Sequence, residues 1–208
     1  MFPSSFDGSS TTASSIIVYG ADHNAEWQSE GLKNALVRLG DVLDTSGLEP
    51  KFDNYVDICS RVCNLTLTNG GIGVIICGTG IGVSIVANKH KGIYAARCVT
   101  PVDAIDCKVI NNANVLCLSA KTDLAQNIEI IHEFFATRFE AIDRRMDRVR
   151  RINQVENQNF RPATVDPDTT DLSVNRPAPG HVGQKTVEQK TKDQIASEDA
   201  KAVRRGRS

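Results

Sequence analysis

Long apolar runs, excess charge of one sign and paired cysteine motifs are all missing from this sequence of 208 residues. No stretch approaches the roughly 18 uninterrupted apolar residues that a membrane-spanning helix needs, so we expect no membrane partner. The formal net charge of −1 favours neither a strongly acidic protein nor a basic nucleic-acid binder. The opening residues, MFPSSFDGSSTTASS, contain neither a charged leader nor an apolar core. We therefore expect neither a secretory nor a transit signal, and we expect a cytoplasmic protein.

The cysteines offer no obvious metal or disulfide pattern. They are Cys59, Cys63, Cys77, Cys98, Cys107 and Cys117. None form a CxxC pair, which is the spacing typical of structural zinc and of redox centres, so no metal site is predicted. Without a secretory signal, a disulfide framework is not expected either. Cys77, Cys98 and Cys117 lie in or at the ends of apolar runs, where cysteine is usually a small buried hydrophobic residue.

Short apolar runs alternate with segments of helical periodicity along most of the chain. The predicted strands cover residues 15–20, 41–47, 73–78, 92–98 and 113–119. The predicted helices cover 32–39, 54–65, a segment from near Gly80, 101–110, 122–139 and a segment from about Glu140. Strands that alternate with helices predict right-handed crossovers and a parallel sheet covered on both faces. The fold class is therefore α/β, a doubly wound, Rossmann-like sheet of five parallel strands with an extra C-terminal helix.

Two details of this prediction concern the helices. Gly40 should close the first helix, since glycine commonly ends helices. The apolar stripe of the helix over 122–139 should consist of Leu124, Ile128, Ile131 and Phe135.

Both ends of the chain differ in composition from the part between them. Residues 1–14 are rich in Ser and Thr, and residues 157–208 are rich in Pro, Gln, Thr, Asp and Lys without a sustained apolar period. Both compositions predict disorder, because such segments cannot bury enough apolar surface to fold. We expect one folded domain over residues 15–156, between a disordered N-terminal extension and a disordered C-terminal tail.

Polar and glycine-rich segments follow several of the predicted strands. They are Gly20–Asn24, Cys77–Ser84, Cys98–Pro101 and Ser119–Lys121. In doubly wound sheets, ligands bind beyond the carboxyl ends of the strands, where these segments should meet.

The segment CGTGIG, residues 77–82, ends a strand and opens a helix. Glycines let backbone N–H groups approach an anion, and the positive end of a helix adds to the attraction. The same field favours the thiolate of Cys77, which would make it a usable base or nucleophile. The alternative is a cysteine that only packs. Glycines at 78, 80 and 82 match neither the dinucleotide fingerprint nor the P-loop, and an acidic ribose anchor is missing, so a nucleotide-binding module is not favoured.

Two further groups of polar residues stand out. Asp22 and His23 directly follow the first predicted strand. Asp22 would either cap the next helix, with His23 exposed beside it, or form with His23 a polar wall of the cleft. Arginines cluster on the last predicted helix, at Arg144, Arg145, Arg148, Arg150 and Arg151. Such a cluster is either a solvated face or a phosphate clamp.

The chain contains, in order, the segments GADH, NYVD, CGTGIGVSIVANK, KGIYAARC, NNANVLCL and RRMDRVRRI. From Ile16 to about Val155, it thereby resembles the type B ribose-5-phosphate isomerases and the related galactose-6-phosphate isomerase subunits. The resemblance implies an aldose–ketose isomerase that works through an enediolate without a metal or organic cofactor. The implied reaction converts ribose 5-phosphate to ribulose 5-phosphate in the pentose phosphate pathway.

The resemblance also implies roles for individual residues. Cys77 would move the proton between C1 and C2 of the sugar, and Thr79 would help with the hydroxyl protons. Backbone amides from Gly78 to Ser84 would stabilise the oxyanion. The implied substrate-binding residues are Asp22, His23, Tyr55, Gly78, Gly80, Ile81, Gly82, Ser84, Asn111, Lys121, Arg144 and Arg148. Family members are dimers or tetramers, so Arg144 and Arg148 would bind the substrate phosphate of a neighbouring subunit in a homodimer or tetramer, or of a paralogous subunit.

Several positions depart from the family pattern. The resemblance places Val99 where the family has its ring-opening histidine and Thr100 at the Asp or Asn that follows. Valine cannot transfer a proton. Arg145 replaces a phosphate-side histidine, Asp147 replaces an arginine, and Lys121 stands for the arginine of a GxR segment.

Three hypotheses follow from these departures. The chain is an isomerase of ribose 5-phosphate whose ring opens spontaneously or with help from His23 or Thr100, at a cost in rate. Alternatively, it is an isomerase of an acyclic tetrose phosphate, which needs no ring opening. A third hypothesis is a non-catalytic sugar-phosphate-binding subunit whose missing group comes from a partner. The enzyme hypotheses are favoured because the segment from Cys77 to Ser84 is intact.

Overall fold

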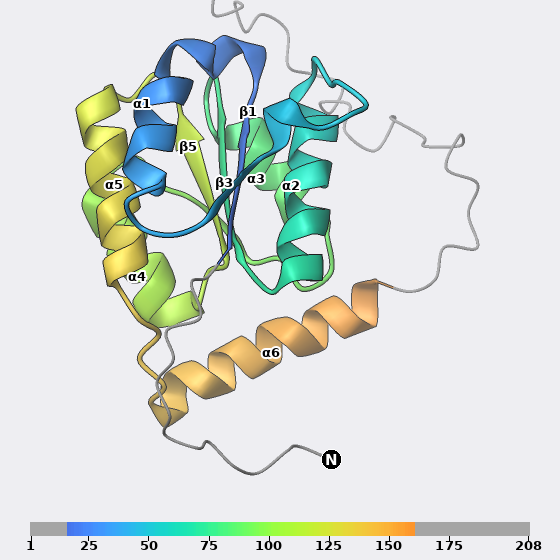
Figure 1. The fold of residues 1–208 in the computed structure, drawn as a ribbon. Coiled ribbons are helices and arrows are strands. Elements are labelled where there is room, and N and C mark those ends of the chain that lie inside the picture. Colours follow the sequence, from blue (N-terminus) through green and yellow to red (C-terminus); the bar gives the residue numbers. More distant parts are fainter. Residues whose placement is uncertain (1–15, 161–208) are drawn as a thin grey trace, which may run out of the picture. The chain divides into compact units, whose positions relative to one another are not determined.

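A five-stranded sheet in the order β2-β1-β3-β5-β4 forms the centre of the computed structural model, which describes residues 16–160 (Figure 1). Its strands are β1 (Ile17–Ala21), β2 (Val42–Asp44), β3 (Ile72–Cys77), β4 (Ala95–Arg97) and β5 (Val115–Ser119). Every neighbouring pair is parallel. The predicted doubly wound α/β fold is confirmed.

Two hydrophobic layers hold the helices on the sheet. Successive side chains of a strand point to opposite faces, so Ile17 and Tyr19 belong to one layer and Val18 to the other. Helices α1 (Glu26–Leu36), α4 (Pro101–Asn111) and α5 (Leu124–Ala136) cover the first face. Helices α2 (Tyr55–Asn69) and α3 (Ile81–Ala87) cover the second face. The side chains of Cys77 and Cys117 belong to the apolar layer beneath them.

Helix α6 (Asp143–Asn159) lies at the edge of the sheet where the strands begin (Figure 1). Its Glu156 Oε1 accepts a hydrogen bond from Gly92 N–H at 2.7 Å, and its Asn153 Nδ2 donates to the Tyr94 hydroxyl at 3.2 Å. Gly92 and Tyr94 directly precede β4, so these bonds fix α6 at the amino edge of the sheet. The helix runs past the boundary that the sequence predicts at Asn157.

Side chains bond to the backbone at the end of β2 and at the beginning of β4. Asp44 accepts a hydrogen bond from Ser46 N–H at 2.9 Å, which starts a 3-10 turn over Thr45–Gly47 and ends β2. Tyr94 N–H and Ala95 N–H donate to the side chains of Asn114 and Asn88 at 2.8 and 3.0 Å. β4 begins only at Ala95 and ends at Arg97, so it is shorter than the predicted strand over 92–98.

Helix α5 differs from its prediction in its end and in its stripe. It ends at Ala136, because Thr137 is extended, with φ −88° and ψ 136°. The following segment is tied to α4 by a bond from Glu140 N–H to Val109 O at 3.3 Å. The fully buried side chains of α5 are Asn127, Ile130, Ile131 and Phe134, whereas the predicted Leu124, Ile128 and Phe135 are half-buried at its margins.

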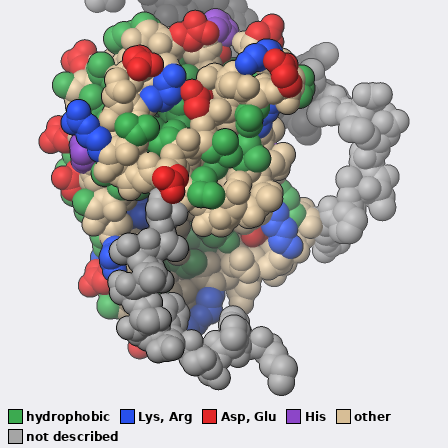
Figure 2. Space-filling view, viewed as in Figure 1, with side chains coloured by type: hydrophobic (Ala, Val, Ile, Leu, Met, Phe, Trp, Pro, Cys, Tyr) green, Lys and Arg blue, Asp and Glu red, His purple; other side chains and the backbone are tan. Residues whose placement is uncertain are grey.

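The surface carries charges of both signs. On the face seen in Figure 2, acidic and basic side chains of the described residues lie side by side, in keeping with the formal net charge of −1. Within residues 16–160, every helix is too short or too polar to cross a membrane. The predicted disorder of 1–14, and of the predicted tail from residue 161 on, falls outside the described residues.

We expect Glu156→Ala to weaken the attachment of α6. Glu156 is 9% exposed, and its loss leaves the N–H of Gly92 without its acceptor. Such a loss costs about 1–3 kcal/mol, so the free energy of unfolding in urea should fall by that amount. The amide of Gly92 should also exchange faster with solvent. Gln154→Ala, at an exposed position of the same helix, is the control, and an equal effect of the two variants would contradict the assignment.

Candidate active site

The ends of three parallel strands bring the predicted polar segments together. Asp22 N–H, which follows β1, donates to Ile76 O of β3 at 2.9 Å. Ala120 N–H, which follows β5, donates to Cys77 O at 2.9 Å, and Cys77 lies opposite Ser119 in the sheet register. Cys77 therefore lies between the residues that follow β1 and those that follow β5, at the carboxyl edge of the sheet.

The sulfur of Cys77 faces a backbone donor. Its Sγ accepts a hydrogen bond from Gly80 N–H at 3.2 Å, and the residue is 5% exposed. A donor aimed at the sulfur favours its negative form. For the fully buried Cys117, burial instead raises the pKa of the thiol. The two cysteines on this face of the sheet are therefore in different electrostatic environments.

The loop after Cys77 is held by bonds from three sides. Arg97 Nε–H donates to Thr79 O at 2.7 Å, and the Ser119 hydroxyl donates to Gly78 O at 3.2 Å. Ile81 N–H donates to Thr79 Oγ1 at 3.3 Å, so the Thr79 hydroxyl lies at the start of α3. The Ser84 hydroxyl donates to Ile81 O at 2.8 Å and is engaged within the helix.

A side chain would collide with its neighbours at Gly80 in this loop and at Gly82 in the first turn of α3. Gly80 has φ +69°, and a Cβ there would lie 3.0 Å from Leu118 O and 3.3 Å from Arg97 Nε. A Cβ at Gly82 would lie 2.8 Å from Cε2 of Tyr55. The missing side chain at Gly82 thus lets the Tyr55 ring, which is 40% exposed, lie against α3 beside the loop.

Asp22 and His23 form a polar wall next to Cys77. Asp22 is 3% exposed, and its side chain makes no capping hydrogen bond with the turn that follows, so the helix-cap interpretation is wrong. Its Oδ2 accepts a hydrogen bond from Asn24 Nδ2 at 3.1 Å. Its Oδ1 receives no hydrogen bond from residues 16–160, although His23 Nδ1 lies 2.7 Å away. This oxygen is buried, and its nearest polar neighbour is the imidazole of His23.

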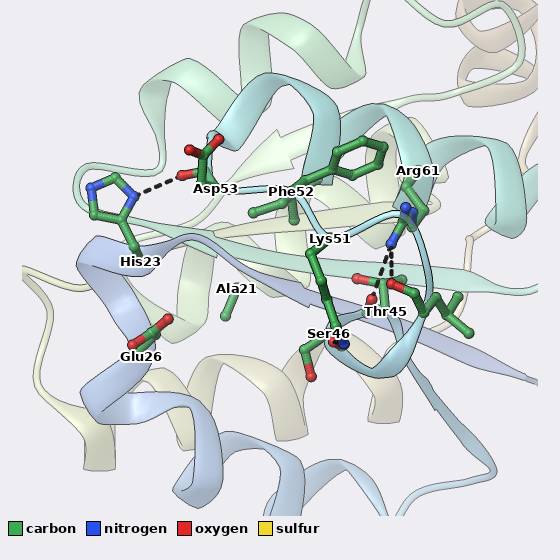
Figure 3. A pocket seen from close by; sticks show the side chains of 11 residues that line it. Ala21, His23, Glu26, Thr45, Ser46, Lys51, Phe52, Asp53 and Arg61 are labelled. Carbon is green, nitrogen blue, oxygen red and sulfur yellow. Dashed lines mark hydrogen bonds between the residues drawn. The ribbon is translucent and has the colours of Figure 1, made fainter.

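A cavity of about 330 Å³ adjoins this wall (Figure 3). It is lined by the end of β1, by the loop over residues 45–53 and by α2, and His23 faces Asp53 at its rim, with Nδ1 3.1 Å from Asp53 O. Arg61 holds the loop by donating to Thr45 O at 3.4 Å, to Leu48 O at 3.0 Å and to Pro50 O. Its guanidinium carbon also lies 4.0 Å from the centre of the Phe52 ring.

Three of the predicted site residues lie elsewhere in the same chain. Asn111 is the last residue of α4, which starts at the carboxyl edge and rises about 1.5 Å per residue towards the amino edge. Arg144 and Arg148 lie on α6, also at the amino edge. Within one chain, none of these three belongs to the site around Cys77. Lys121 is exposed and lies at the correct edge, where its N–H donates to Ser119 Oγ at 3.1 Å.

Some residues of the site could not be found from a catalytic sequence pattern. Asn24, Arg61 and Arg97 all make contacts described above, but none belongs to a recognised catalytic pattern. Arg97 lies in the segment KGIYAARC, but only its charge at the end of an apolar strand set it apart there.

Comparison with known proteins finds similar sequences and structures for most of the folded part of the chain. The sequence profile of the ribose/galactose isomerase family matches residues 17–152. The probable ribose-5-phosphate isomerase B of Mycoplasma genitalium is 40% identical over 103 residues, which are 47% of this chain and 67% of that protein. The crystal structure of ribose-5-phosphate isomerase B from Mycoplasma genitalium with bound ribulose-5-phosphate is similar, with a TM-score of 0.62 and 31% identity over 69% of this chain and 97% of that one.

A relative with another named activity also matches. The 4-deoxy-4-sulfo-D-erythrose isomerase of Clostridium sp. is 31% identical over 105 residues, which are 49% of this chain and 66% of that protein.

We expect Gly80→Ala to destabilise the protein. Alanine at φ +69° is strained, and its Cβ would press on Leu118 O, so the free energy of unfolding should fall by about 1–3 kcal/mol. Gly47→Ala is the matched control, because an added Cβ there meets nothing within 4 Å. It should leave the stability unchanged or raise it by at most about 1 kcal/mol. Equal stabilities of the two variants in urea unfolding would show that Gly80 tolerates a side chain.

Proposed function

The chain belongs to the ribose/galactose isomerase family of sugar-phosphate isomerases, and from that membership we propose that it converts ribose 5-phosphate to ribulose 5-phosphate. The observation that carries this proposal is the Cys77 sulfur, which accepts the Gly80 N–H at the edge of the sheet where the Asp22 carboxylate also lies. A proton acceptor and a hydroxyl acceptor side by side suit the transfer of a proton between adjacent sugar carbons. We place this reaction in the pentose phosphate pathway of the cytoplasm.

In the proposed reaction, Cys77 acts as the base without a metal or organic cofactor. Its thiolate takes the proton from C2 of the aldose, the C–H electron pair forms a C1=C2 double bond, and the carbonyl pair moves onto O1. The hydroxyl proton then passes from O2 to O1 with help from the Thr79 hydroxyl. The thiol returns its proton to C1, which leaves the carbonyl at C2. Backbone N–H groups from Gly78 to Ser84 stabilise the charge on the enediolate.

The substrate-binding roles follow from the positions of the side chains. The Asp22 carboxylate would accept a sugar hydroxyl, His23 and Tyr55 would flank the carbon chain, and Lys121 would add positive charge at the same edge. Arg144 and Arg148 lie at the opposite edge of their own chain. They can bind the phosphate only in a neighbouring copy, so we propose a homodimer or tetramer, or a pairing with a paralogous subunit, in which each site takes these arginines from its partner.

A second candidate is the isomerisation of an acyclic tetrose phosphate. It is favoured by Val99, which offers no proton-transferring group, and by similarity to a protein named 4-deoxy-4-sulfo-D-erythrose isomerase. The substrate in that name carries a sulfo group at C4 and so has no O4 with which to close a furanose ring. A tetrose 4-phosphate likewise has its O4 blocked, and an isomerase of such a sugar needs no ring opening.

We expect Cys77→Ala to abolish proton exchange at the carbon next to the carbonyl. The substituted enzyme lacks the proposed base, so exchange in deuterated buffer, followed by NMR, should fall at least about 100-fold. Binding of the sugar phosphate should stay within a few-fold, because Asp22 and the glycine loop are unchanged. Cys107→Ala, away from the glycine loop on α4, should keep normal exchange. Full exchange in the Cys77 variant would remove this residue from the mechanism.

The same exchange experiment distinguishes the candidate substrates. Four-, five- and six-carbon sugar phosphates would be compared at equal concentration with the unmodified protein. We expect the fastest exchange with ribose 5-phosphate. Faster exchange with erythrose 4-phosphate would establish the acyclic alternative, and binding without exchange for every sugar would identify a non-catalytic subunit.

A further inference from the structure

Arg97 reaches the glycine loop from two strands away. It ends β4, which pairs with β5, and β5 in turn pairs with β3. In this register Arg97 lies opposite Cys117, and Cys117 lies opposite Ile75, so the three side chains emerge on the face that α3 covers. The long arginine side chain extends across the end of β5, and its Nε–H donates to Thr79 O at 2.7 Å.

The carbonyl that Arg97 contacts and the N–H that reaches Cys77 belong to the same peptide group. Thr79 provides the C=O, and Gly80 provides the N–H that donates to Cys77 Sγ at 3.2 Å. A chain of two hydrogen bonds therefore runs from the guanidinium, through one peptide, to the sulfur. We propose that Arg97 is a positioning residue that stabilises the thiolate of Cys77 through the Thr79–Gly80 peptide.

The direction of both bonds suits this role. A cation that donates to a carbonyl pulls electron density towards the oxygen, which makes the N–H of the same peptide a stronger donor. That N–H then stabilises negative charge on Sγ more than it stabilises a neutral thiol. The guanidinium also fixes the orientation of the peptide plane, and its positive charge acts on the sulfur directly at longer range.

The surroundings of Arg97 leave this contact open. Gly80 has no Cβ, and a Cβ there would lie 3.3 Å from Arg97 Nε. Asp103 of α4 interacts electrostatically with Arg97, but its Oδ2 already accepts N–H bonds from Val99 at 3.0 Å and Thr100 at 2.9 Å. Those bonds, led by the one from Val99, hold the pKa of Asp103 below its usual value, and the charge of Arg97 acts in the same direction. Asp103 is thus engaged in capping α4.

Three substitutions of Arg97 separate its charge from its hydrogen bond. Arg97→Lys keeps a cation that can donate, Arg97→Gln keeps a neutral donor, and Arg97→Met keeps neither. The first readout is the rate at which methyl methanethiosulfonate modifies Cys77 at neutral pH, followed on the Cys77 peptide by mass spectrometry. We expect the rate to fall roughly threefold to tenfold in Arg97→Met, to be intermediate in Arg97→Gln and to be nearly retained in Arg97→Lys. Arg38→Met, an exposed cation just beyond α1, is the control and should keep the normal rate.

The second readout uses the isomerase activity, because this inference deepens the proposed function and rests on the role of Cys77 in it. The kcat of the Arg97→Met variant should fall by a similar factor while KM stays within about twofold, since the loss acts on the base rather than on the substrate. If no sugar phosphate is turned over, the proposed function fails, but the modification rates still test the effect of Arg97 on the sulfur.

Two outcomes would overturn the inference. An unchanged modification rate in Arg97→Met, with turnover intact, would show that the sulfur does not sense the guanidinium. Equal losses in Arg97→Gln and Arg97→Met, accompanied by equal falls in the thermal midpoint, would show that Arg97 only holds the loop in place. A folded Arg97→Gln variant keeps the comparison possible even if Arg97→Met does not fold.

Discussion

The peptide group between Thr79 and Gly80 is the contact on which the proposed chemistry depends. It can take its orientation only because Gly80 adopts a positive φ that a side chain would oppose, next to Leu118 O. With that orientation, its carbonyl meets Arg97 and its N–H meets Cys77. The sheet supplies the other partners by placing the ends of β1, β3 and β5 side by side, so that Asp22 and Ser119 arrive next to the same sulfur. The orientation of this one peptide therefore decides which hydrogen bond the sulfur of Cys77 receives.

The cysteines show how far environment rather than residue type decides reactivity. Cys77 and Cys117 belong to the same apolar layer of the sheet. Burial raises the pKa of the Cys117 thiol, so that residue behaves as a packing group, as the sequence predicts. Cys77 lies at the end of its strand, where a loop N–H turns towards it. A difference of two residues in register along neighbouring strands separates a structural thiol from a candidate base.

The parts of the molecule that follow from regular periodicity could be predicted from the sequence, and the parts that follow from individual side chains could not. Alternating apolar runs revealed the parallel sheet, and the glycines at 78, 80 and 82 revealed the loop at its edge. The end of α5 was misplaced because the apolar sequence continues past Ala136, while a backbone bond from Glu140 to α4 stops the helix. Asn111 was assigned to the site although it ends α4 at the opposite edge of the sheet. The resemblance shows that a residue matches a family motif, but it does not show how far that residue lies from Cys77 within one chain. Arg97 was missed because its partner is a backbone carbonyl, which no side-chain pattern can reveal.

Arg61 has a consequence for the energetics of ligand binding. One guanidinium fastens three carbonyls of the loop over residues 45–53 and also packs on Phe52. The wall of the cavity beside His23 is thereby ordered before any ligand arrives. The conformational entropy of this segment is lost when the protein folds. Its ordering therefore does not reduce the free energy of binding of an incoming molecule. The entropy lost in ordering this loop therefore lowers the stability of the free protein. With a flexible loop, the same loss would instead lower the affinity for each ligand.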